Sequence, residues 1–200
     1  MVVISEDSDY GYTVERRWSR AWIEDIQSGG TAASSIVRLA ENQSILGMTS
    51  SPDGSTLYFS LAEPIKNERG QEKVMANLRS INTGGGGITQ VTNGQWIDAN
   101  PSVSEDGKFL VFNSNRIQFD KPDLFRISTD KNGGVMVIRQ TAEGANFQPS
   151  LGKGGIIAFT YKPRFRGRFS SNQIWTLGGI NDYPTQLRNG SMPSLSPDGW

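Results

Sequence analysis

The sequence contains no cysteine and no histidine among its 200 residues. These absences exclude disulfide bonds, cysteine nucleophiles, Ser-His-Asp triads and metal sites built on histidine or cysteine. Catalysis would need carboxylates, lysine, tyrosine or a metal held by oxygen ligands. Because the lack of cysteine suits both a reducing cytoplasm and an envelope protein that avoids stray disulfides, it assigns no compartment.

The sequence also lacks an excess of either charge, since 20 basic residues balance 20 acidic ones. We therefore expect no nucleic-acid partner. No signal peptide and no apolar run of membrane length is visible, so we expect no insertion into a membrane. No segment has a clear helical pattern, whereas 23 glycines and 9 prolines favour many short strands joined by tight turns.

One pattern recurs along the chain: a strand, a tight turn and a second strand. Its complete copy covers residues 101–113, where Glu105-Asp106-Gly107 supplies the turn between two apolar segments. Further copies begin at Ser51, Pro149 and Pro193. Successive copies are spaced by 53, 48 and 44 residues, a period typical of propeller blades with four strands.

Two further strands complete each repeat. A third strand is predicted at 22–26, 77–81, 123–127 and 173–177, and a fourth, after a glycine turn, at 36–39, 88–92, 135–139 and 185–188. We therefore expect an all-β chain of about sixteen strands, a β-propeller of four-stranded antiparallel blades with four repeats. The repeats are expected around 44–92, 97–141, 145–188, and 191–200 joined with 1–41, in a single domain over residues 1–200.

The motif Ser51-Pro52-Asp53-Gly54, followed by an apolar strand that ends in Phe59-Ser60 and later by a strand such as 123–127, resembles the TolB-like or WD40-like (PD40-type) β-propeller repeat. The resemblance covers essentially the whole chain. It implies a propeller that serves as a non-catalytic subunit of a bacterial cell-envelope complex, or one attached to an enzyme such as a serine peptidase. A periplasmic or cell-envelope location is expected from this resemblance alone.

The two ends of the sequence suggest how such a ring closes. Residues 196–200 followed by 1–5 match one uninterrupted copy of the hairpin 104–113. We therefore expect residues 1–5 to pair with 191–196, so that the four-bladed ring is closed by its own termini. A homodimer with eight blades and a fragment of a longer propeller are the alternatives.

The binding face is predicted from the connections between strands. Short glycine turns should lie on one face, and the long connections 6–20, 61–73, 114–122 and 161–172 should lie on the other, where function is expected. In the last connection cations alternate with aromatic residues, a pattern that suits an acidic or phosphorylated group but also an ordinary solvated loop. Trp96, in a crossover between blades, could stack on a sugar ring. The predicted binding residues are Lys162, Arg164, Phe165, Arg166, Arg168 and Trp96.

We expect no catalytic residue, no metal and no cofactor. Glu6, Asp7 and Asp9 lack the ligand spacing of a calcium loop. The run 84–87 of four glycines has no following Lys-Ser/Thr and precedes a strand, which argues against a phosphate loop. The predicted function is a non-catalytic scaffold that presents its loop-rich face to a protein partner, and a saccharide or peptide ligand is the alternative.

Overall fold

The computed structural model describes residues 2–5, 20–24, 33–66, 69–130, 134–141, 143–165, 168–178 and 183–196. Apart from one 3-10 turn, η1 (Lys153–Gly155), all secondary structure in these ranges is β-strand. The prediction of an all-β chain is therefore confirmed.

The strands form four antiparallel sheets, which we call blades 1 to 4. Blade 1 contains β1 (Val2–Ser5), β2 (Arg20–Glu24) and β3 (Ala33–Arg38). Blade 2 contains β4 (Ser44–Ser50), β5 (Thr56–Lys66), β6 (Glu72–Asn82) and β7 (Thr89–Gln90). Blade 3 contains β8 (Asp98–Val103), β9 (Phe109–Ser114), β10 (Asp123–Ser128) and β11 (Val135–Arg139). Blade 4 contains β12 (Gly144–Leu151), β13 (Ile157–Phe165), β15 (Gln173–Leu177) and β16 (Thr185–Asn189), with β14 (Arg168–Phe169) paired to β13.

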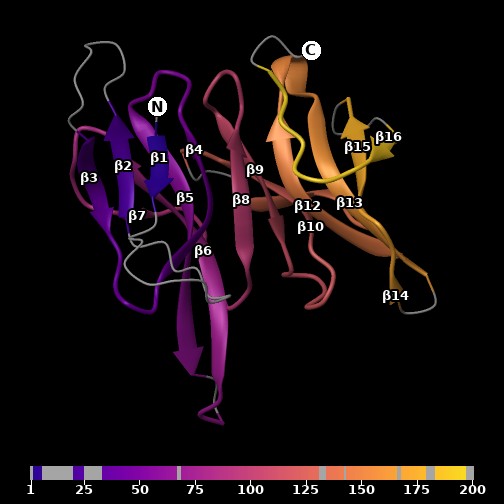
Figure 1. Cartoon of the computed structure of the whole chain (residues 1–200), viewed down its shortest axis with the longest axis horizontal. Coiled ribbons are helices and arrows are strands. Elements are labelled where there is room, and N and C mark those ends of the chain that lie inside the picture. The colour runs from indigo at the N-terminus through magenta and orange to yellow at the C-terminus, as the bar shows by residue number, and fades with distance from the viewer. Residues whose placement is uncertain are drawn as a thin grey trace.

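The blades lie side by side in chain order, with β1–β3 at one end of the molecule and β12–β16 at the other (Figure 1). Among the described residues β1 is hydrogen-bonded to β2, and no sheet is closed. The predicted pairing of residues 1–5 with 191–196, and with it the closed four-bladed ring, is therefore not confirmed.

The Ser-x-Asp-Gly motif forms its turn through the serine and aspartate side chains. The Ser104 hydroxyl donates to Asp106 Oδ1 at 2.7 Å, and its oxygen accepts the Phe109 amide at 3.1 Å. Asp106 Oδ1 also accepts the amide of Lys108, and Gly107 takes a φ of 71° that favours glycine. Ser51 and Asp53 make the same bonds in blade 2. The motif is thus a self-contained turn, which explains its recurrence.

A threonine joins each Asp-Gly turn to the neighbouring turn between the third and fourth strands. Thr129 donates its amide to Lys108 O at 2.9 Å and its hydroxyl to Gly107 O at 2.8 Å. Thr83 makes the matching bonds to Ser55 O and Gly54 O. The two kinds of short turn therefore share one face in blades 2 and 3, as predicted.

The hydrophobic core lies between the blades. Leu110 and Phe112 of β9 pack with Tyr58 and Leu78 of blade 2, whereas Val111, between them in sequence, packs with Phe159 of blade 4. Both faces of β9 are therefore covered, as its apolar sequence predicted. Burying one such phenylalanine contributes on the order of 2–3 kcal/mol.

Two of the predicted long loops are partly strands. β5 and β6 extend to Lys66 and from Glu72 as a hairpin that projects beyond the other blades (Figure 1), and β13 continues to Phe165. The loop prediction at 61–73 was wrong, because residues 61–66 and 72–73 belong to β5 and β6. β4 begins at Ser44, opposite Ala62, so beyond this residue β5 pairs with β6 alone and Pro64 lies on a sheet edge, where proline is tolerated.

Candidate functional site

The long connections and the crossovers between blades meet on one face, which we call the loop face. Gln43 Nε2 donates to Glu63 Oε2 at 3.1 Å, and the Ile97 amide donates to Asn115 Oδ1 at 2.7 Å. The Arg164 amide donates to Glu143 O in the same way. The long connections and crossovers therefore lie together in blades 2 to 4, as predicted, and the connection 6–19 lies outside the described residues.

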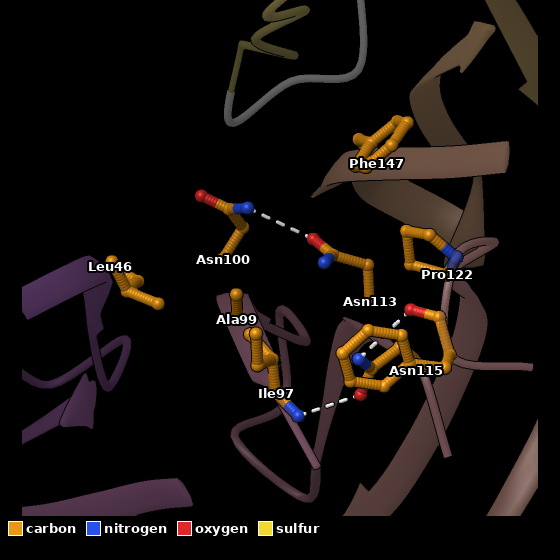
Figure 2. A pocket seen from close by; sticks show the side chains of 9 residues that line it. Leu46, Ile97, Ala99, Asn100, Asn113, Asn115, Pro122 and Phe147 are labelled. Carbon is orange, nitrogen blue, oxygen red and sulfur yellow. Dashed lines mark hydrogen bonds between the residues drawn. The ribbon is translucent and has the colours of Figure 1, made fainter. Parts of the chain in front are cut away.

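A pocket of about 500 Å³ lies on the inner side of blades 2 to 4, toward the loop face (Figure 2). β4, β8 and β12 are the first strands of these blades, and β8 contacts both β4 and β12. The lining residues come from these strands, from the crossover before β8, from β9 and from the connection that follows it. They are Leu46, Ile97, Ala99, Asn100, Asn113, Asn115, Phe119, Pro122 and Phe147.

Each first strand is bent beside this pocket by a residue with positive φ. Gly47, Asn100 and Gln148 have φ values of 123°, 52° and 51°, and each lies within a β-bulge of its strand. Met192, the equivalent position of the next repeat, has a φ of 57°. A non-glycine residue in this region is uncommon and costs on the order of 1 kcal/mol, so the bends need support from neighbouring blades.

Side chains of one blade support these bends by accepting hydrogen bonds from backbone N–H groups of the next blade. Asn113 Oδ1 accepts the Gln148 amide at 3.2 Å, and Ser102 Oγ accepts the Leu151 amide at 2.9 Å. The same two bonds recur one repeat later. There Thr160 Oγ1 accepts the Met192 amide at 3.0 Å, and Ser150 Oγ accepts the Leu195 amide at 3.0 Å. The segment 190–196 is thus held against blade 4 as β12 is held against blade 3.

These bonds also fix the orientation of an asparagine pair in the pocket. Because the Gln148 amide can only donate, the atom of Asn113 that faces it must be the oxygen. Asn100 Nδ2 donates to this same oxygen at 2.9 Å (Figure 2). Asn100 Oδ1 therefore points away from Asn113, toward the side of the pocket where Leu46 lies.

The pocket wall on the side of blade 3 is the connection after β9. Asn115 shapes it by accepting the Ile97 amide and donating Nδ2 to Phe119 O at 3.2 Å. Phe119 is 78% exposed although it lines the pocket, and Ile117 in the same connection is 44% exposed. Exposed apolar side chains next to a pocket are a feature of interaction surfaces.

Arg116 anchors this connection to the core of blade 3. Its Nη2 contacts both carboxylate oxygens of the fully buried Asp98, at 2.8 and 2.9 Å. Its guanidinium carbon also lies 5.4, 5.5 and 5.1 Å from the ring centroids of Trp96, Phe112 and Phe125. The connection is therefore held rigidly at its beginning.

A second half-buried arginine lies between blades 3 and 4. Arg139 stacks on Phe159, Tyr161 and Trp175, and its Nε donates to Asn146 Oδ1 at 3.2 Å. Burial lowers the pKa of Arg139 and raises the pKa of the neighbouring Asp123. Asp123 Oδ1 accepts from Asn146 Nδ2, while Oδ2 is buried without a hydrogen-bond partner. These groups join the two blades.

The predicted cationic patch is only partly visible. Lys162 and Arg164 are half-buried on β13, and Arg164 Nη1 pairs with Asp120 Oδ2 at 2.5 Å. This hydrogen bond lowers the pKa of Asp120 and brings Arg164 to the connection that carries Phe119. For Phe165 and Arg168 the structure describes the backbone strands β13 and β14 alone, and Arg166 lies outside the described residues. Binding by these five residues stays a prediction.

Trp96 is half-buried in the crossover between blades 2 and 3. Its ring packs against Gly94 and under the guanidinium of Arg116, and its Nε1 is buried without a hydrogen-bond partner. Its neighbour Ile97 lines the pocket. Sugar stacking by Trp96 therefore stays a prediction, although much of the ring serves to hold Arg116.

Sequence reasoning did not identify Asn100, Asn113, Phe119 or Phe147 as site residues. A signal was present for Asn100, because it occupies the same repeat position as Gly47 and asparagine tolerates positive φ. Nothing local distinguishes Asn113, whose oxygen accepts the Gln148 amide from another blade.

The described residues contain no group of three or more acidic side chains placed to hold a metal ion. They also contain no helix with the length and apolar character needed to cross a membrane.

Comparison with known proteins gives matches at the level of structure alone. No family model and no curated sequence matches the chain. A putative TolB from Agrobacterium tumefaciens is similar with a TM-score of 0.67 and 19% identity, over 92% of this chain and 63% of that chain. The tricorn protease is similar with a TM-score of 0.63 and 14% identity, over 92% of this chain and 22% of that chain. An oligogalacturonate lyase from Vibrio parahaemolyticus is similar with a TM-score of 0.61 and 12% identity, over 90% of this chain and 51% of that chain.

The chain thus spans less than two thirds of the length of each of these proteins. At these identities the likeness concerns the fold, and the named proteins include enzymes as well as TolB. The blades, their order and their turns agree with the expectation from the Ser-Pro-Asp-Gly repeats. The chain has the fold of the TolB-like β-propeller repeats.

Proposed function

We propose that the chain is a non-catalytic β-propeller module that presents its loop face to a protein partner. The observation that carries this proposal is the pocket between β4, β8 and β12, which opens beside the exposed side chains of Phe119 and Ile117. Rigid strands that hold loops around a concave, largely apolar site are the usual design of a binding surface.

The absence of a catalytic role is inferred from the lining of the pocket. None of its nine lining residues is acidic or basic, so the lining offers no general acid or base and no charged nucleophile. The sequence supplies no histidine or cysteine that could enter from elsewhere. We extend the proposal to residues 1–200 as one domain and, from the family resemblance, to a bacterial cell-envelope complex.

A closed ring belongs to the same proposal. What supports it is the segment 190–196, which donates the Met192 and Leu195 amides to blade 4 as a first strand of a further blade would. The segment 190–196 would then pair with β1, either of the same chain or of a second copy. In a longer propeller another segment would take the place of β1.

A photo-crosslinking experiment tests the proposed function. Photoreactive p-benzoylphenylalanine is placed at position 119 on the loop face or, as the matched control, at position 187 on β16, where Leu187 is 60% exposed. In a bacterial envelope extract we expect a discrete protein adduct from position 119 and none from position 187. Adducts of equal yield from both positions, or from position 187 alone, would contradict the proposal.

The alternative is a saccharide- or peptide-binding propeller associated with an enzyme. The similarity in fold to a lyase and to a protease supports this alternative. A glycan array that shows binding lost in Trp96→Ala, without any crosslinked protein, would support this alternative.

A further inference from the structure

We propose that the pocket recognises an uncharged amide attached to an apolar body, such as an internal segment of the partner's polypeptide. This inference rests on the proposed function, because it names the chemistry by which the loop face would select its partner. It also differs from the expectation of a cationic patch that binds an acidic group.

The first step concerns charge. All nine lining side chains are uncharged, and two cations near the pocket, Arg116 and Arg164, are each engaged by a carboxylate, of Asp98 and Asp120 respectively. A charged ligand group that entered the pocket would lose its hydration without gaining an opposite charge. The pocket therefore favours neutral groups.

The second step concerns hydrogen bonds. The contact between Asn100 Nδ2 and Asn113 Oδ1 leaves one acceptor, Asn100 Oδ1, and one donor group, Asn113 Nδ2, without a partner among the described residues. An amide of a ligand carries one acceptor and at least one donor close together. The asparagine pair is held by the Gln148 backbone before any ligand arrives, so little ordering is needed on binding.

The third step concerns the rest of the pocket. Six of the lining residues are apolar, namely Leu46, Ile97, Ala99, Phe119, Pro122 and Phe147. A saccharide would bring several hydroxyl groups against this wall, and each would lose a hydrogen bond to water without replacement. An amide with an aliphatic or aromatic side chain matches both parts of the pocket.

The test uses small neutral probes and the side-chain NH₂ signals of Asn100 and Asn113 in ¹⁵N-correlated NMR spectra. The probe is N-acetyl-leucinamide, and its matched control is N-acetyl-leucine, which differs by a carboxylate in place of the carboxamide. N-acetyl-leucine N-methylamide ends in a secondary amide, as in a peptide backbone, whereas N-acetyl-leucinamide ends in a primary carboxamide, as in a side chain. Comparing the two shows which kind of amide group of the partner the pocket prefers. Methyl glucoside represents a neutral saccharide.

We expect saturable shifts with N-acetyl-leucinamide, with a dissociation constant on the order of 1 mM that is unchanged by added salt. N-acetyl-leucine should bind at least about fivefold more weakly, and methyl glucoside should cause no shift. Equal or tighter binding of the carboxylate, a salt-dependent affinity, or binding of the sugar instead would overturn the inference.

Two variants locate the site. Asn100→Gly removes the acceptor and keeps a residue suited to a φ of 52°, and Phe119→Ala removes an exposed wall of the pocket. Each should weaken the probe about fivefold, whereas Tyr183→Ala, at a position 93% exposed, should have no effect. Unchanged binding in both pocket variants would contradict the inference, even if the crosslink at position 119 forms and the proposed function stands. A probe that binds as expected without any crosslink would instead count against the proposed function.

Discussion

The two inner strands of a blade and its outermost strand are held by different interactions. Six consecutive residues of β9 are half-buried or buried and pack against blades on both sides, whereas every residue of β16 is exposed. The first strands β8 and β12 are bent by residues with positive φ. β12 donates two amides to side chains of blade 3, and β8 accepts the Ser60 hydroxyl of blade 2 at Asp98 O. Stability and the candidate binding pocket therefore both depend on the inner strands, and the outer strands mainly complete the sheets.

The largest contrast is expected between a buried inner phenylalanine and an outer leucine. Phe112→Ala should lower the free energy of unfolding by about 3–5 kcal/mol, because the ring is fully buried between blades and leaves a cavity. Leu187→Ala on β16 should cost at most about 0.5 kcal/mol. Urea unfolding of the two variants measures both changes in the free energy of unfolding. Similar losses in the two variants would show that the inner and outer strands do not differ as described.

A second contrast compares a buried ion pair with an exposed one. Arg116→Met leaves the fully buried Asp98 without its partner and should cost about 3 kcal/mol. Arg164→Met breaks the more exposed pair with Asp120 and should cost at most about 1 kcal/mol. The double variant Asp98→Asn with Arg116→Met should recover part of the first loss, since no charge then stays buried. Equal losses in the two single variants would argue against a rigid anchor at Arg116.

The backbone bends allow a sharper comparison at one repeat position. Gly47→Ala should destabilise by about 1–3 kcal/mol, because φ is 123° and the added Cβ would lie 2.9 Å from Asn100 Cα. Asn100→Gly at the equivalent bend should change stability by less than about 1 kcal/mol, because glycine suits positive φ. Thermal unfolding compares them, and tolerance of Gly47→Ala would show that blade 2 lacks this bend.

The smallest effect is expected in the Asp-Gly turns, which lie at the surface. Hydrogen bonds from Ser51 and Ser55 lower the pKa of Asp53 to about 2, from 3.8. A lowered pKa in the folded state means that this carboxylate stabilises the fold above pH 3.8 and loses that contribution as the pH falls toward 2. The stability difference between the wild type and Asp53→Asn should therefore shrink over this pH range. A difference that stays constant would show that the carboxylate is not the stabilising group.

Much of the fold could be predicted from the sequence because its signals are local. Ser104, Asp106 and Gly107 form their turn with one another, and the same residue types recur at Ser51, Asp53 and Gly54. Each fourth strand overlaps its predicted range, and the strand Val135–Arg139 coincides with it. Each of these signals lies within a few residues of the structure that it predicts.

The candidate pocket could not be predicted in this way because its residues act across blades. Asn113 orients Asn100 and also accepts the amide of Gln148, 35 positions further along the chain. Phe119 appears as one apolar residue in a polar connection, and its position beside the pocket depends on Asn115. The sequence pattern instead predicted binding by the cationic run around Arg164, whereas the structure pairs Arg164 with Asp120.

The most direct test of the inner-strand account is hydrogen exchange measured amide by amide. We predict slow exchange for Gln148 and Leu151, and also for Met192 and Leu195, because all four donate to side chains of the preceding blade. The exposed strand β16 should exchange faster than these four amides. Fast exchange of Met192 and Leu195 beside protected Gln148 and Leu151 would contradict the claim that the segment 190–196 docks as a further inner strand.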